Sequence, residues 1–71
     1  MRYGIVIERG PSSYGASVPD LPGCVAVGET VEEAKELIQE AIALHLEGLQ
    51  AEGLPIPEPK TLCEYVEVTA S

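Results

Sequence analysis

Val18 to Glu33 reads V-P-D-L-P-G-C-V-A-V-G-E-T-V-E-E, and this stretch indicates a turn, a short strand and the start of a helix. Leu21-Pro22-Gly23-Cys24 is typical of a type II turn, because proline presets φ at the second position and glycine tolerates a positive φ at the third. Cys24 to Val27 can form a short buried strand that Gly28 ends. Thr30-x-x-Glu33 matches a capping box, in which threonine accepts from a helix amide and glutamate reaches back to the amide of the threonine. The stretch therefore specifies a β-turn-β-helix unit.

Two strands precede this unit and a long helix follows it. Alternating apolar residues predict strands over Arg2–Glu8 and Tyr14–Val18. These runs and the third lie too close together for crossovers, so we expect an antiparallel meander. Apolar residues at i, i+3, i+4 and i+7 spacing predict a helix from about Val31 to Glu52, and Gly53 stands where a glycine would end it.

The C-terminal part predicts a return path and a fourth strand. Leu54–Pro59 has proline at alternate positions, which favours an extended path back along the helix. Glu64–Thr69 alternates again, and we expect it to pair in parallel with the first strand through a right-handed crossover. The predicted fold class is α+β: one small β-β-β-α-β domain over residues 1–71, with a three-stranded antiparallel meander, one helix and a fourth strand parallel to the first.

The net charge of the chain limits the classes of partner that it can bind. At 71 residues with a net charge of −8, it lacks the Lys and Arg clusters that nucleic acid or an anionic membrane requires, and a basic protein partner is favoured. A domain this small has a thin core, so we expect a homodimer or higher oligomer. There is no signal region at Met1-Arg2-Tyr3 and no apolar run near the ~20 residues that span a bilayer, so the cytoplasm is the expected compartment.

Two cysteines, Cys24 and Cys63, lack a metal-binding or redox motif. In a cytosolic protein they are expected to be reduced, small apolar core residues. A disulfide between them is the alternative, and it would require Cα atoms within about 7 Å.

Few residues could support catalysis or bind a metal or cofactor, and no cofactor is expected. His45 is the only histidine, and no serine, cysteine or second acid lies at a helical spacing that would place it beside His45. We therefore interpret it as a half-buried residue of the apolar stripe or of a dimer seam. The acids on predicted strands that could hold a metal are Glu8, Glu64 and Glu67, which fall short of a two-metal carboxylate cluster.

Three residues are candidates for partner binding: Tyr14, Asp20 and Glu29. Asp20 lies in a dense turn sequence, where its carboxylate is expected to bond nearby amides, and exposed recognition is its alternative role. Tyr14 follows the Ser12-Ser13 turn and could reach a partner, although a half-buried strand position is the simpler interpretation. The acids along the helix lie on the face away from its apolar stripe, where they serve solubility or oppose a basic partner.

The chain resembles the HicB-like antitoxins of bacterial and archaeal toxin–antitoxin modules over nearly its full length. PDLPG-C followed by G-E-T-x-E-E-A is the most specific part of this resemblance. The segments that carry the resemblance are Tyr3–Glu8, Tyr14–Cys24, Val27–Ala34, Glu40–Leu46 and Gly53–Pro59.

The resemblance implies a partial RNase H-like fold and a protein that silences a small basic mRNA-cleaving toxin of the HicA type by occluding its active site. The resemblance also implies that the protein is not an enzyme. Many members also carry a C-terminal DNA-binding domain, whereas this sequence stops at Ser71, so direct DNA binding is not expected. Two alternatives stay open. One is an orphan oligomeric domain with a structural or ligand-binding role, and the other is a degenerate RNase H-like metal-binding protein.

Overall fold

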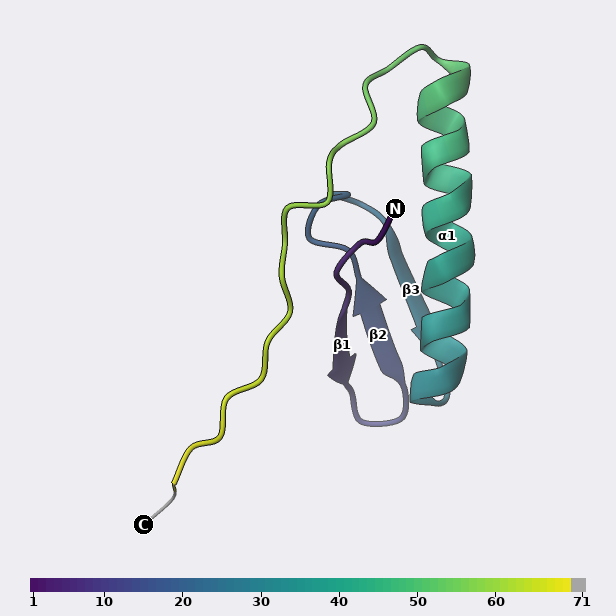
Figure 1. Cartoon of the computed structure of the whole chain (residues 1–71). Coiled ribbons are helices and arrows are strands. Elements are labelled where there is room, and N and C mark those ends of the chain that lie inside the picture. The colour runs from purple at the N-terminus through teal and green to yellow at the C-terminus, as the bar shows by residue number, and fades with distance from the viewer. Residues whose placement is uncertain (70–71) are drawn as a thin grey trace.

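Three short strands form an antiparallel meander, and one long helix covers one face of it (Figure 1). The computed structural model describes residues 1–69, so the last two residues of the expected 1–71 domain lie outside the described part. The strands are β1 (Val6–Arg9), β2 (Tyr14–Ser17) and β3 (Val25–Gly28), in the spatial order β1-β2-β3. The helix α1 spans Val31–Ala51. The predicted meander and helix are confirmed, although β1 begins four residues later than predicted.

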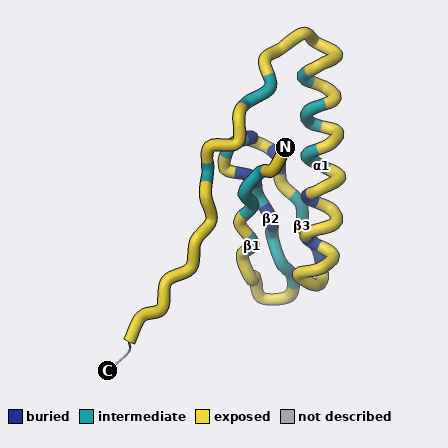
Figure 2. The backbone as a smooth tube through the Cα atoms, viewed as in Figure 1, coloured by how far each residue is buried: buried dark blue, intermediate teal, exposed yellow. Residues whose placement is uncertain are grey.

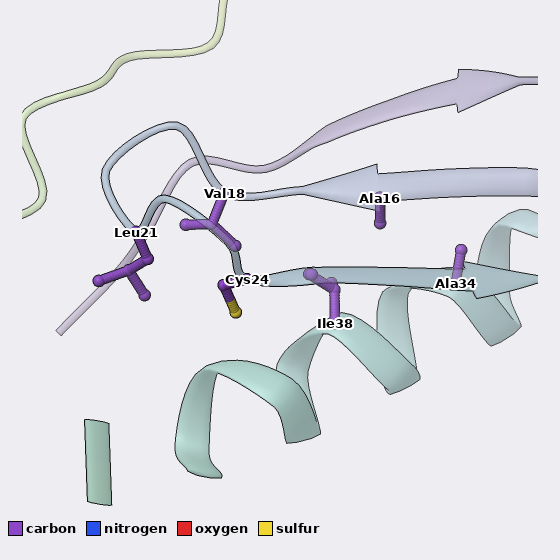
Figure 3. Close-up of a cluster of buried hydrophobic side chains, with 6 residues drawn as sticks. All are labelled: Ala16, Val18, Leu21, Cys24, Ala34 and Ile38. Atoms are coloured by element: carbon purple, nitrogen blue, oxygen red, sulfur yellow. The ribbon is translucent and has the colours of Figure 1, made fainter. Parts of the chain in front are cut away.

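The core lies between the inner face of the sheet and the first half of α1. Six residues are buried there: Ala16, Val18, Leu21, Cys24, Ala34 and Ile38 (Figure 3). Tyr3, Ile5 and Ile7 pack against this cluster from one side, as their shared face predicts. Polar side chains are absent among the buried residues of the described range 1–69. The fold therefore depends on a small, wholly apolar centre. Figure 2 shows how little of the backbone is buried.

The third strand differs from its prediction as a buried strand. Ala26 packs toward the core, whereas the side chains of Val25 and Val27 are 64% and 63% exposed. The reason is that α1 covers only one face of the sheet, so every second residue of β3 points to the uncovered face. A run of four apolar residues has no alternation from which the uncovered face could be recognised.

Leu21 enters the core from two consecutive turns. The amide of Leu21 donates to the carbonyl of Val18 at 3.0 Å, and the amide of Cys24 donates to the carbonyl of Leu21 at 3.1 Å. Gly23 has φ +85°, which confirms the turn predicted at Leu21-Pro22-Gly23-Cys24. Because both turns close on Leu21, its side chain is fixed between sheet and helix and is fully buried.

Both ends of α1 are capped. The amide of Glu33 donates to the hydroxyl of Thr30 at 3.0 Å, but the Glu33 carboxylate accepts from the amide of Glu29 rather than from that of Thr30 as predicted. At the other end Gly53 has φ +70° and donates to Gln50, while Leu54 donates to Leu49. This is a Schellman motif, which satisfies the last carbonyls of the helix.

The second half of α1 extends past the sheet. The contacts of α1 are with β2 and β3, and its buried residues are Ala34 and Ile38, both in its first half. Ala41, Ile42 and Leu46 are only partly buried. Figure 2 shows the same trend, because the dark blue of buried residues is confined to the first half of the helix.

The segment after α1 returns beside the loop that precedes β3 and then leaves the sheet (Figure 1). The hydroxyl of Tyr3 donates to the carbonyl of Pro57, and the thiol of Cys63 lies 3.5 Å from the carbonyl of Ile5. A Cβ at Gly4 would lie 2.9 Å from this sulfur, so a glycine allows the close approach.

The fourth strand expected over Glu64–Thr69 is not formed in the described structure of the single chain. The segment is bound near Ile5, before β1 begins, and its contact there uses the side chain of Cys63. A strand needs backbone bonds to a neighbour, and alternation in the sequence does not say which chain supplies that neighbour.

Candidate protein-binding surface

Exposed acids follow the outer side of α1. Glu32, Glu36, Glu40 and Glu47, here called the acidic ridge, are all exposed, and the first three recur at intervals of four residues on one side of the helix. The buried residues Ala34 and Ile38 lie on the other side. Lys35 is the only basic residue of α1. The acidic ridge therefore presents a nearly uniform negative charge to an approaching partner.

Exposed leucines accompany the acidic ridge. Leu37 and Leu44 are seven residues apart, and the Leu44 side chain is 69% exposed. Residues seven apart lie close to one line along a helix, so these leucines border the acids with apolar surface. A surface of this composition can attract a cationic protein at long range and bury apolar area on contact.

Glu29 and Tyr14 lie at the same end of the sheet. Tyr14 begins β2 and is paired with Gly28, which directly precedes Glu29. Glu29 is exposed, and its amide is bound by the capping carboxylate of Glu33. Tyr14 is half-buried against the core. The structure therefore brings two of the three candidate residues together beside the start of the acidic ridge.

Asp20 lies elsewhere, because it follows the opposite end of β2 in the loop before β3. Its carboxylate accepts from the amides of Lys60 and Thr61, each at 3.0 Å, and from the Thr61 hydroxyl at 2.9 Å. The sequence predicted bonds to nearby turn amides, whereas the bonded residues are some forty positions away. Asp20 thus clamps the C-terminal segment to the loop.

The clamp changes the titration of Asp20. The backbone hydrogen bond from Thr61 is the main cause that lowers the pKa of the carboxyl below 3.8, with further lowering by the Thr61 hydroxyl and by Lys60 and an opposing effect of desolvation. Because these donors stabilise the ionised form, the clamp is complete at neutral pH.

No group of three or more His, Cys, Asp or Glu side chains within residues 1–69 could hold a metal ion. Glu8 lies on β1, while Glu64 and Glu67 lie in the segment that leaves the sheet. His45 is half-buried in the second half of α1, beyond the sheet. Over the same range, no helix is long and apolar enough to cross a membrane.

The cysteines differ from their shared prediction as core residues. Both are free, but only Cys24 is buried, and burial raises the pKa of its thiol. Cys63 is exposed, because it lies in the segment that leaves the sheet.

Sequence reasoning missed the clamp between Asp20 and residues 60 and 61. Neither periodicity nor turn chemistry relates positions forty residues apart. The one signal in the sequence was an acid in a turn between Pro19 and Pro22, because a carboxylate in a turn accepts bonds from backbone amides.

Comparisons with known proteins identify a family. The model of the HicB-like antitoxins of bacterial toxin–antitoxin systems matches residues 3–70. An uncharacterised 14.9 kDa protein of Haemophilus phage HP1 is 38% identical over 66 residues, covering 93% of this chain and 50% of that protein. Antitoxin HicB 2 of Photorhabdus laumondii is 33% identical over 72 residues, covering all of this chain and 52% of that antitoxin. The chain thus spans about half the length of these two relatives.

A solved structure agrees as well. A chain of a HicA3–HicB3 toxin–antitoxin complex superimposes with a TM-score of 0.71 at 34% sequence identity, covering 83% of this chain and 69% of that one. Together with the capped helix after a three-stranded meander, these matches show that the chain belongs to the family of HicB-like antitoxins.

Proposed function

We propose that this chain is an antitoxin that binds a small basic mRNA-cleaving toxin of the HicA type and neutralises it by occluding its active site. The observation that carries the proposal is the acidic ridge of α1 in a chain of net charge −8. The likeness to a chain of the HicA3–HicB3 complex supports the same class of partner. A toxin that cleaves mRNA needs a cationic surface for its substrate, and an acidic protein can cover that surface.

The proposed mechanism requires binding alone. Opposite charges accelerate encounter, and the leucines beside the acidic ridge then bury apolar surface against the toxin. Occlusion excludes RNA by occupying the same place, so the antitoxin contributes no catalytic group. We propose that the antitoxin meets the toxin in the cytoplasm, where mRNA is found. Direct binding of nucleic acid has no part in it, because phosphates and the acidic ridge repel each other.

The proposed contact surface begins at Glu29 and Tyr14 and continues along the acidic ridge. Glu29 is exposed at the start of α1, and the half-buried Tyr14 lies at the same end of the sheet. Asp20 was a third candidate, but its carboxylate is bonded to Lys60 and Thr61, and we propose that it holds the C-terminal segment in place without contacting the toxin.

A fourth strand over Glu64–Thr69, parallel to β1, would complete the RNase H-like arrangement, and it remains part of the proposal. Tyr65, Val66 and Val68 favour extended structure. Such a strand forms only with a bonded neighbour, whose source is considered in the next subsection.

The proposal is tested by titrating a HicA-type toxin of the same host into this chain in a calorimeter. A complex of defined stoichiometry is expected, with an affinity that falls as salt screens the charges. Replacing Glu40 by Lys reverses one charge on the acidic ridge. A unit charge pair in water at contact distance is worth about 1 kcal/mol, so an attraction of that size becomes a repulsion of the same size and binding should weaken roughly 30-fold.

The matched control is Glu58→Lys, which makes the same charge change at an exposed position outside α1. It should bind nearly as well as the wild type. Equal losses in both variants would mean that only net charge matters and that the acidic ridge is not the contact surface. No heat at low salt with a catalytically active toxin would contradict the proposed function.

A further inference from the structure

The last described segment exposes an unusual amount of apolar surface. Leu62–Thr69, here called the C-terminal tail, carries four large apolar residues that are between 82% and 99% exposed: Leu62, Tyr65, Val66 and Val68. Exposed apolar residues gathered in one short segment mark a site of interaction. Valine and tyrosine also favour strands, so the expected interaction is pairing with a sheet.

The sheet has an edge that such a strand can join. β1 is paired with β2 on one side only, and β3 is likewise the end strand on the other side. An end strand presents a row of unpaired N–H and C=O groups, which is a template for another strand.

Charge distinguishes the two edges. At the β1 edge, Arg2 lies before the strand and Arg9 ends it, so positive charges exceed the single negative charge of Glu8. At the other edge, β3 is followed by Glu29 and the acids of α1. The C-terminal tail carries Glu64 and Glu67. Attraction to the arginines therefore favours the edge of β1, and like charges disfavour that of β3.

Within one chain the C-terminal tail does not use this edge. A groove of about 530 Å³ separates its start from residues 2–5, and the contact across it is a side-chain bond from Cys63 to the carbonyl of Ile5. Beyond Cys63 the tail runs away from β1 into solvent (Figure 1). The clamp at Asp20 fixes the point of departure, so the tail is presented outward with its strand-forming groups free.

We propose that the C-terminal tail of one copy pairs as an added strand with the open edge of β1 in a second copy, in a reciprocal exchange that forms a homodimer. Eight residues extend about 26 Å at about 3.3 Å per residue, twice the length of the four-residue β1. A two-fold axis makes both exchanges equivalent, so each tail loses its exposed surface to the other copy. This inference is independent of the toxin-binding proposal.

The first test is the mass in solution, measured by light scattering and sedimentation equilibrium on the full chain without toxin. We expect the mass of two 7.5 kDa chains at high micromolar concentration. Val66→Pro removes a backbone donor from the tail. A backbone hydrogen bond between strands is worth about fivefold in an equilibrium constant. The substitution removes one such bond from each of the two tails, so the dissociation constant of the dimer should rise roughly 25-fold.

The matched control is Glu58→Pro, which introduces proline ahead of the tail between Pro57 and Pro59. It should leave the dimer intact. Neither substitution touches the core, so helical circular dichroism should be unchanged in both variants and would show that the fold persists.

The second test identifies the chain that supplies the strand. In a mixture of isotope-labelled and unlabelled copies, filtered Overhauser spectra should connect the tail of one copy to β1 of the other. A monomer at high micromolar concentration would overturn the proposal. So would a dimer that Val66→Pro leaves unaffected, or contacts between the tail and β1 that arise only within one chain.

Discussion

Removing the side chain of Leu21 should destabilise this protein more than any other leucine truncation outside the helix. Leu21 is fully buried, and two turns direct it into a core of only six buried residues (Figure 3). Leu21→Ala leaves a cavity there, because the two turns hydrogen-bonded around this residue restrict how far the backbone can collapse.

The size of the effect follows from the burial. Losing a fully buried leucine side chain costs about 2–5 kcal/mol, and about 3 kcal/mol is the central value. A 71-residue domain has a free energy of unfolding of about 4–11 kcal/mol. The substitution should therefore remove about a quarter or more of the stability, and lower the melting temperature by about 12–24 °C.

The assay is urea denaturation followed by circular dichroism, with both proteins at the same concentration because self-association would add to the apparent stability. Leu44→Ala is the matched control, since it deletes the same atoms from an exposed position and should change the free energy of unfolding by less than about 0.5 kcal/mol. Equal losses in the two variants, or a loss below about 1 kcal/mol for Leu21→Ala, would refute the assignment of Leu21 to the centre of the core.

Three further perturbations follow from the structure. Gly28→Ala should cost about 1–3 kcal/mol of unfolding free energy, because its Cβ would lie 2.6 Å from a backbone nitrogen of α1; Gly15→Ala, which meets no atom within 4 Å, should be nearly neutral in the same denaturation experiment. Thr30→Ala should cost about 1 kcal/mol in thermal unfolding through loss of the N-cap, and Thr30→Ser should restore most of it; no rescue by serine would contradict a capping role. The lowered pKa of Asp20 means that its contribution to stability is present above the unfolded value of 3.8 and is lost as the pH falls through the lower folded value. The amide of Thr61 should therefore lose its protection from hydrogen exchange only in that acid range. Asp20→Ala removes the acceptor altogether, and protection of the Thr61 amide that persists in this variant at neutral pH would contradict the clamp.

The sequence predicted the parts of the fold that depend on local chemistry. The turn after Leu21, the N-cap at Thr30 and the glycine end of α1 at Gly53 are each determined by a few neighbouring residues, and all are confirmed. The inner face of the sheet was also predicted, because alternate residues of a strand share a face whatever lies opposite.

The remaining features depend on contacts between distant residues. Val25 and Val27 are exposed because one helix covers only one face of the sheet, which their own sequence does not encode. Asp20 bonds Lys60 and Thr61 only because the returning segment passes the turn.

The structure brings two of the three candidate residues together. Tyr14 and Glu29 lie together because strand pairing brings Tyr14 opposite Gly28, but Asp20 is at the other end of β2. This separation already follows from the predicted antiparallel meander, in which a residue after the second strand lies at the opposite end from one that begins it. The acidic ridge itself was expected from the helical period.

We have proposed that this HicB-like chain silences a basic mRNA-cleaving toxin by covering its active site. The most direct test adds the chain in increasing amounts to a HicA-type toxin of the same host that is cleaving a labelled mRNA. We expect cleavage to stop once the toxin is saturated and to resume when salt dissociates the complex. Continued cleavage at full rate in the presence of excess folded chain at low salt would contradict it.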